Sequence, residues 1–184
     1  MKKCKEILIG VLLLSMVFFT ACTSKAAKAM EKVELGQKYL TELNYTEAVA
    51  SFTEAIGLDP ENISAYMGRA EAYVGLKQYD DAKTDYTTAI EKAVEQPYTR
   101  AEAYVGRAEV NEVTNANEAA LSDYESAQNI LDSIDWSKFK EITEQMLKAL
   151  QEKIEKACEE LRALLGLNAV SYTHLRAHET CADL

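Results

Sequence analysis

Apolar residues recur along most of the chain every three or four positions, and short polar segments interrupt them at regular intervals. Between residues 29 and 134 each apolar-periodic stretch is roughly a dozen residues long, which is a common helix length. This spacing places the apolar side chains on one face of an α-helix. The pattern therefore predicts an all-α fold of amphipathic helices joined by short turns.

The helical pattern repeats in blocks of 34 residues, over 29–62 and 63–96, and again over 101–134 after a four-residue insertion at 97–100. Each block has small residues where two helices would cross closely and large aromatic residues that would fill the space between them. The small residues are Gly36, Ala70, Ala108, Ala48, Ala82 and Ala120, and the rings are Tyr39, Tyr73, Phe52, Tyr86 and Tyr124. Because one helical pair cannot bury its apolar face alone, the blocks are expected to stack. We expect the insertion to lengthen the first helix of the third block.

A period of this length with these small and aromatic positions resembles the tetratricopeptide repeat. The resemblance covers residues 29–134. It implies a solenoid of about three helical hairpins, whose first helices line a concave groove that takes an extended or helical peptide. The resemblance therefore implies a protein that acts as an adaptor or scaffold by binding a protein or peptide partner.

The groove positions of the family can be carried over onto the first helix of each block. They fall on apolar and acidic residues, which suit a peptide with aliphatic anchors and Lys or Arg side chains. The carried-over positions are Val33, Gln37, Leu40, Met67, Glu71, Val74, Glu102, Val105, Glu109 and Glu112. In the alternative arrangement, a C-terminal helix folds into the groove and covers Val33, Met67 and Val105.

Some members of the family hold the terminal carboxylate of a chaperone tail with a basic clamp. At the lysine and asparagine positions of that clamp, this chain has Val33 and Gln37. The sequence therefore disfavours binding of chaperone tails.

The first 21 residues are typical of an export signal. Lys2, Lys3 and Lys5 precede an apolar run over 7–19, which small residues follow. The run is short for a membrane-spanning helix, which needs about 20 residues.

The segment 19–22, Phe-Thr-Ala-Cys, resembles the bacterial lipobox. The resemblance implies removal of residues 1–21, acylation of Cys22 and a lipid anchor at the extracytoplasmic face of the cell membrane. Residues 22–28 would then be a short tether. The alternatives are a fully secreted protein and an uncleaved anchor.

From Asp135 the repeat pattern gives way to the spacing of one long helix, which Gly166 is expected to end. We expect this helix, over 135–167, to cap the apolar end of the solenoid, with Trp136 and Phe139 docked on the third repeat. The alternative is a structural envelope protein that forms a homodimer through this helix. The apolar spacing departs from strict heptads, which favours the capping role.

Residues 168–184 differ in composition from the rest of the chain, and 170–180 resemble translated sequencing-adapter read-through. The resemblance implies an artefactual, disordered tail. The tail holds both histidines of the chain, and His174, His178 and Cys181 have a spacing that would allow three zinc ligands. The read-through interpretation is favoured over a metal site.

Composition narrows the range of functions. The chain is 48% hydrophobic and 27% charged, which is ordinary for a folded protein, and its net charge is −10. This charge opposes contact with nucleic acid and with anionic headgroups, so we expect no nucleic-acid partner and membrane contact only through lipid. Outside the tail there is no histidine, and the sequence has no phosphate-binding loop or nucleophile motif. Neither an enzyme nor a cofactor is expected.

Overall fold

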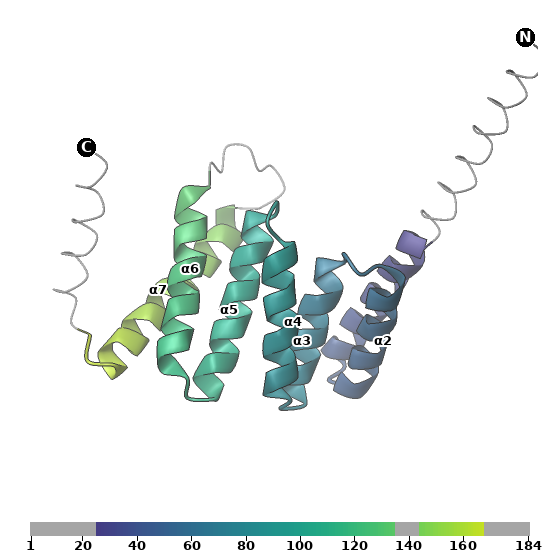
Figure 1. Ribbon diagram of the computed structural model, residues 1–184, viewed down its shortest axis with the longest axis horizontal. Coiled ribbons are helices and arrows are strands. Elements are labelled where there is room, and N and C mark those ends of the chain that lie inside the picture. Colours follow the sequence, from purple (N-terminus) through teal and green to yellow (C-terminus); the bar gives the residue numbers. More distant parts are fainter. Residues whose placement is uncertain (1–24, 135–143, 168–184) are drawn as a thin grey trace, which may run out of the picture. The chain divides into compact units, whose positions relative to one another are not determined.

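The computed structural model describes residues 25–134 and 144–167. Cys22, the start of the predicted C-terminal helix and the tail with His174, His178 and Cys181 lie outside the described residues. The described part is helical and contains no strand, which confirms the all-α class (Figure 1). Its helices are residues 25–41, α2 (Tyr45–Leu58), α3 (Ile63–Gly75), α4 (Tyr79–Lys92), α5 (Pro97–Val113), α6 (Asn117–Ser133) and α7 (Glu144–Leu164).

The helices belong to two compact units that divide within α4, between Asp85 and Tyr86. In the first unit α2 packs on α3, and in the second unit α5 packs on α6 and α6 on α7. The helix α5 begins at Pro97, which suits the first helical position because its missing N–H would be unbonded there. The insertion therefore lengthens this helix, as expected.

An aromatic ring packs closely against glycine in each unit. In the first unit the buried ring of Phe52 on α2 faces Gly36 of the helix 25–41 and Gly68 of α3, and a Cβ at Gly36 would lie 2.7 Å from the ring. In the second unit a Cβ at Gly106 would lie 2.5 Å from the ring of Tyr86. These helices can approach so closely because glycine has no Cβ.

A repeated ion pair joins the helices next to these rings. In the first unit Arg69 Nε and Nη2 donate to Asp85 at 2.7 and 2.8 Å, and Nη1 donates to Thr53 at 3.2 Å. One guanidinium of α3 thereby bonds both α2 and α4. Such a two-point bond between planar groups is directional as well as charged, so it fixes the rotation of α3 about its axis.

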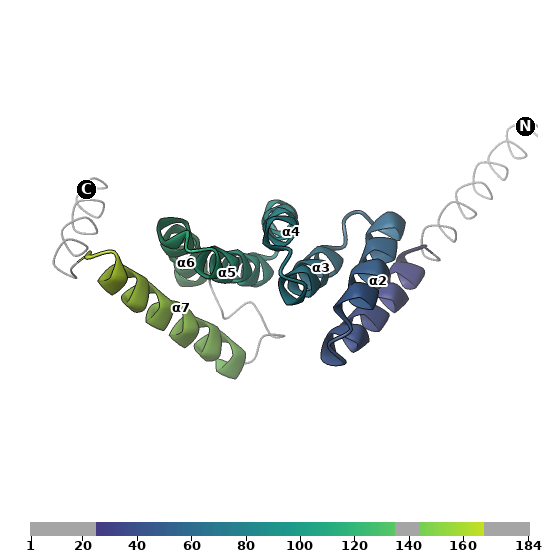
Figure 2. The same cartoon turned by 90° about the horizontal axis from the view of Figure 1, so that it is seen from below.

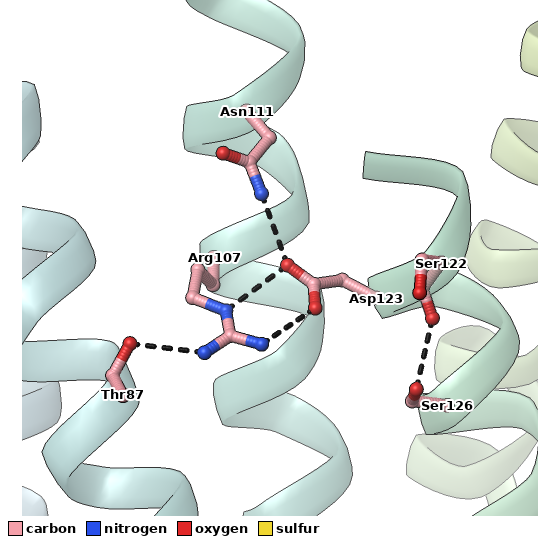
Figure 3. A network of polar contacts seen from close by, with 6 residues as sticks. All are labelled: Thr87, Arg107, Asn111, Ser122, Asp123 and Ser126. Atoms are coloured by element: carbon pink, nitrogen blue, oxygen red, sulfur yellow. Dashed lines mark hydrogen bonds and ion pairs between the residues drawn. The ribbon is translucent and has the colours of Figure 1, made fainter. Parts of the chain in front are cut away.

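The second unit repeats this contact at the corresponding positions (Figure 3). Arg107 Nε and Nη2 donate to Asp123 at 3.0 and 2.7 Å, and Nη1 donates to Thr87 at 2.9 Å. Asn111 donates a further bond to Asp123 at 3.0 Å, so the buried carboxylate is well satisfied. The hydrogen bond to Asp123 raises the pKa of Arg107 above its usual value.

The helix α7 covers the apolar side of α5 and α6 (Figure 2). Its side chains Ile154, Cys158 and Leu161 are buried in one cluster with residues of both helices. The helix ends where Gly166 adopts a φ of 70°, which allows the Leu167 N–H to bond back to the Arg162 carbonyl at 2.8 Å. The predicted capping contact is therefore present, whereas the predicted docking of Trp136 and Phe139 lies outside the described residues.

The ring contacts predict opposite effects for two glycine-to-alanine substitutions. Gly106→Ala should lower the free energy of unfolding by about 1–3 kcal/mol, because the new Cβ displaces the Tyr86 ring. Gly57→Ala should raise it by about 0.5–1 kcal/mol, because Gly57 is a helical residue with nothing within 4 Å of its Cβ position. Urea denaturation of both variants checks this, and a gain in both would show that the ring contact is loose.

The first repeat offers a control for the ion pair, because Leu35 and Ser51 occupy the positions of Arg107 and Asp123. Asp123→Ala leaves the guanidinium without its partner and should cost about 3–5 kcal/mol of unfolding free energy. The double variant Arg107→Leu/Asp123→Ser removes both charges and should cost less than the single variant. Urea denaturation measures both losses, and a larger loss for the double variant would contradict this interpretation.

Candidate functional site

Three stripes of side chains run along α3, and they differ in what they contact. One stripe is buried against neighbouring helices. The second stripe takes part in the ring and ion-pair contacts of Arg69, whose guanidinium lies 5.8 Å from the centre of the Tyr66 ring. The buried stripe is Ala65, Gly68 and Ala72, the second stripe is Tyr66, Arg69 and Tyr73, and the third stripe is Met67, Glu71 and Val74. The third stripe lies outside the buried core cluster of this unit, and its members are predicted groove positions.

The predicted groove positions of the first unit divide into buried and accessible residues. Val33 and Leu40 are each 7% exposed and belong to the core cluster of Phe52, so a ligand would reach them only through the residues that cover them. The accessible positions are Gln37 and Glu71, which are exposed, and Met67 and Val74, which are half-buried. We refer to Gln37, Met67, Glu71 and Val74 as the first-unit surface. Its role in binding stays a prediction.

In the third repeat, α7 contacts the predicted groove positions. Val105 is 3% exposed and shares a buried cluster with Ile154 and Leu161 of α7. One turn further along α5, Glu109 forms an ion pair with Lys153 of α7. Of the three residues named in the alternative arrangement, Val105 is therefore the one that the C-terminal helix covers.

The other two acidic positions of the third repeat also have partners within the chain. The Tyr124 hydroxyl donates to Glu112 at 2.6 Å, and burial together with this carboxylate raises the pKa of Tyr124. The Tyr98 hydroxyl donates to Glu102, whose pKa is raised by burial and partly lowered again by that bond. A ligand would have to displace these hydroxyls to reach either carboxylate.

The described part of the chain offers little other chemistry. Within 25–134 and 144–167, no group of three or more His, Cys, Asp or Glu side chains is placed to hold a metal ion. No helix in these two ranges is long and apolar enough to cross a membrane. The predicted lipidation site Cys22 and the three zinc candidates of the tail lie outside both ranges.

Sequence reasoning missed the ion pairs that orient α3 and α5. Their signal was present in the repeated Gly-Arg-Ala-Glu of residues 68–71 and 106–109, with an aspartate at the same later position of both blocks. A charge that recurs at one position of an otherwise apolar repeat points to a buried pair. The glycines before each arginine, which face the rings, were also overlooked.

Comparison with known proteins agrees with this architecture. Residues 39–105 match a family model described as tetratricopeptide repeat. The chain is 38% identical over 110 residues to human DnaJ homolog subfamily C member 7, with 57% of this chain and 21% of the relative covered. It is 35% identical over 103 residues to the homologue of that protein from Dictyostelium discoideum, with 54% and 18% covered. The chain thus spans about a fifth of the length of these curated relatives.

Solved structures extend the match to most of the chain. The first tetratricopeptide domain of Spaghetti (RPAP3), bound to the HSP90 peptide SRMEEVD, has a TM-score of 0.53 and 25% identity, with 72% of this chain and 94% of that chain covered. The TPR2B domain of yeast Sti1, in a complex with pHsp70, has a TM-score of 0.56 and 26% identity, with 71% and 98% covered. Residues 39–105 therefore match the tetratricopeptide repeat, and the described part of the chain has the all-α helical-hairpin solenoid fold of tetratricopeptide proteins.

Proposed function

We propose that the chain is a protein-interaction adaptor whose first-unit surface binds a peptide segment of a partner protein. The observation that carries this proposal is the match over about 70% of the chain to tetratricopeptide domains solved with bound ligands. In the first unit the third stripe of α3 combines apolar contact area with one exposed carboxylate. A surface of this kind favours an amphipathic or extended peptide.

The charge of the chain indicates a ligand different from that of the solved neighbours. The HSP90 peptide in the Spaghetti (RPAP3) complex is rich in acidic residues. This chain has a net charge of −10, and Val33 and Gln37 stand at the clamp positions that would hold a carboxylate. An acidic tail would therefore be repelled, whereas Met67 and Val74 suit aliphatic anchors and Glu71 suits Lys or Arg.

The chain contains an internal example of the proposed contact. Lys153 of α7 pairs with Glu109, which occupies the groove position in α5 that Glu71 occupies in α3. A lysine beside an aliphatic residue, here Ile154, thus already binds one predicted groove position. Because α7 takes up these contacts in the third repeat, the proposed ligand surface is confined to the first unit.

Self-association through the C-terminal helix has less support. The apolar residues Ile154, Cys158 and Leu161, which a pairing helix would present to a second copy, are buried against α5 and α6. A homodimer formed through them would have to break these contacts. The adaptor is therefore the function that the geometry supports best.

Photo-crosslinking tests the first-unit surface. A benzophenone amino acid in place of Met67 in the full chain should form an adduct with a discrete partner in native membranes. Glu71→Lys should abolish the adduct by reversing the charge beside the probe, whereas Glu95→Lys makes the same charge change at an exposed turn residue and should retain it. Adducts that survive Glu71→Lys, in a variant with an unchanged circular dichroism spectrum, would overturn the proposal.

We further propose that lipid on Cys22 holds the adaptor at the extracytoplasmic face of the bacterial cell membrane. The support is the resemblance of residues 1–22 to an export signal and a lipobox. The net charge of −10 offers anionic headgroups no attraction of its own. Dual acylation is sufficient for stable anchoring.

Cys22→Ala should move the protein from the membrane fraction to the soluble fraction or leave it as an unprocessed precursor. Incorporation of an alkyne-labelled fatty acid, detected on a gel, should fall to background in the same variant. Cys158→Ala is the matched control and should keep the full label, because this thiol is buried in the helical core. Equal labelling of the Cys22→Ala variant and the unmodified chain would refute lipidation at this residue.

A further inference from the structure

The helix α7 covers residues of α5 that belong to the predicted groove. Val105 is buried in one cluster with Ile154 and Leu161 of α7, and Glu109 forms an ion pair with Lys153. In the third repeat, a segment of the chain therefore occupies the place that the family resemblance gives to a peptide ligand. A partner could reach Val105 only if α7 left it.

The contact between α6 and α7 is incomplete. A polar pocket of about 630 Å³ lies between the two helices, within the second unit. Gln128 of α6 lines this pocket, and its Oε1 atom is buried without a hydrogen-bond partner in the described structure. The same position of the first two blocks is occupied by Ile56 and Ile90. An amide with an unsatisfied acceptor in place of an isoleucine, beside a gap, weakens the contact of α6 with α7.

The ion pairs of α7 add little to this contact. Lys153, which pairs with Glu109 of α5, has a side chain that is 52% exposed. Arg162, which donates to Glu125 of α6 at 3.1 Å, is half-buried. Ion pairs that water reaches contribute little to stability. Most of the free energy that holds α7 therefore comes from the apolar stripe that it buries against α5 and α6.

The contact between α5 and α6 is more complete. Tyr124 of α6 is 1% exposed, and its hydroxyl donates to Glu112 of α5 at 2.6 Å. The buried carboxylate of Asp123 accepts hydrogen bonds from Arg107 and Asn111 of α5. Helices held by fewer buried contacts open at a lower free energy than the rest of a domain. We therefore expect α7 to separate from α5 and α6 before these two helices separate from each other.

We propose that α7 is an exchangeable helix that competes for the groove positions of α5, and that an amphipathic helix of a partner protein takes its place. The chemistry of the partner helix follows from α7 itself. It carries a lysine for Glu109, and aliphatic residues in the places of Ile154 and Leu161, about two helical turns apart, for contact with Val105. The proposal rests on the adaptor function, but it requires no ligand at the first-unit surface.

A fluorescent synthetic peptide with the sequence of residues 144–167 tests the exchange. Ile154→Ala in the full chain weakens the internal helix, so this variant should bind the peptide about tenfold more tightly than the unmodified chain does. Leu164→Ala is the matched control, because Leu164 is 68% exposed on the same helix, and it should change the affinity less than about twofold. Equal affinities of the two variants, or no saturable binding to the Ile154→Ala variant, would overturn the proposal.

The site and the chemistry of the bound peptide can be tested with two altered peptides. A benzophenone in place of Ile154 in the peptide should form adducts with α5 and α6, and adducts confined to the first unit would overturn the proposal. A peptide with Lys153→Glu should bind about threefold more weakly, because it places a carboxylate beside Glu109. Equal affinity of this peptide would contradict the role given to the lysine of the partner helix.

Native-state hydrogen exchange of the unmodified chain tests the proposal even if Ile154→Ala unfolds the second unit. Amides of α7 should exchange about tenfold faster than those in the middle of α5 and α6, because α7 opens without them. Exchange of all three helices at one rate would overturn the proposal. Adducts captured at Met67 of the first-unit surface would be unaffected by that outcome, so the adaptor function and the exchange of α7 fail separately.

Discussion

Close packing of aromatic rings against glycine is the constraint on which the rest of this structure depends. Phe52 has room in the first unit only because Gly36 and Gly68 lack a Cβ, and Tyr86 is in the same situation against Gly106. The ring contact determines which side of each helix is buried, and the neighbouring arginine then determines how the helix is rotated. Two of the three stripes of α3 are thereby committed to the fold, and the third stripe lies outside the buried core cluster.

The same logic explains why the two units differ. In the second unit the third stripe of α5 carries Val105, Glu109 and Glu112, and each of these residues is buried or bonded within the chain. The C-terminal helix accounts for two of these contacts because it must cover the apolar end of the repeats, as a solenoid requires. Capping and ligand binding thus compete for the same positions of α5, whereas Gln37 of the helix 25–41 and Glu71 of α3 are exposed.

The sequence predicted the period, the helix class, the rings and the capping helix, because these depend on spacing and residue size. It did not predict which groove positions are buried, since family positions say where a side chain lies on a helix and not what covers it. Val33 and Val105 show this limit.

The turns show another limit of sequence-based prediction. Leu43 and Lys77 adopt a φ of 59° at the position where Asn115 adopts 58°, although leucine and lysine seldom do so. At these turns, the backbone hydrogen bonds that end each helix outweigh the conformational preference of the residue.

Hydrogen–deuterium exchange of the full chain, with and without the partner captured at the first-unit surface, tests most directly which face of the helices binds the partner. If the third stripe of α3 is the binding face, exchange should slow in residues 30–41 and in α3, while the amides of α2 keep their rates. Slower exchange confined to α2 and α4, with the helix 25–41 and α3 unchanged, would contradict this assignment and place the partner on the opposite side of the repeats.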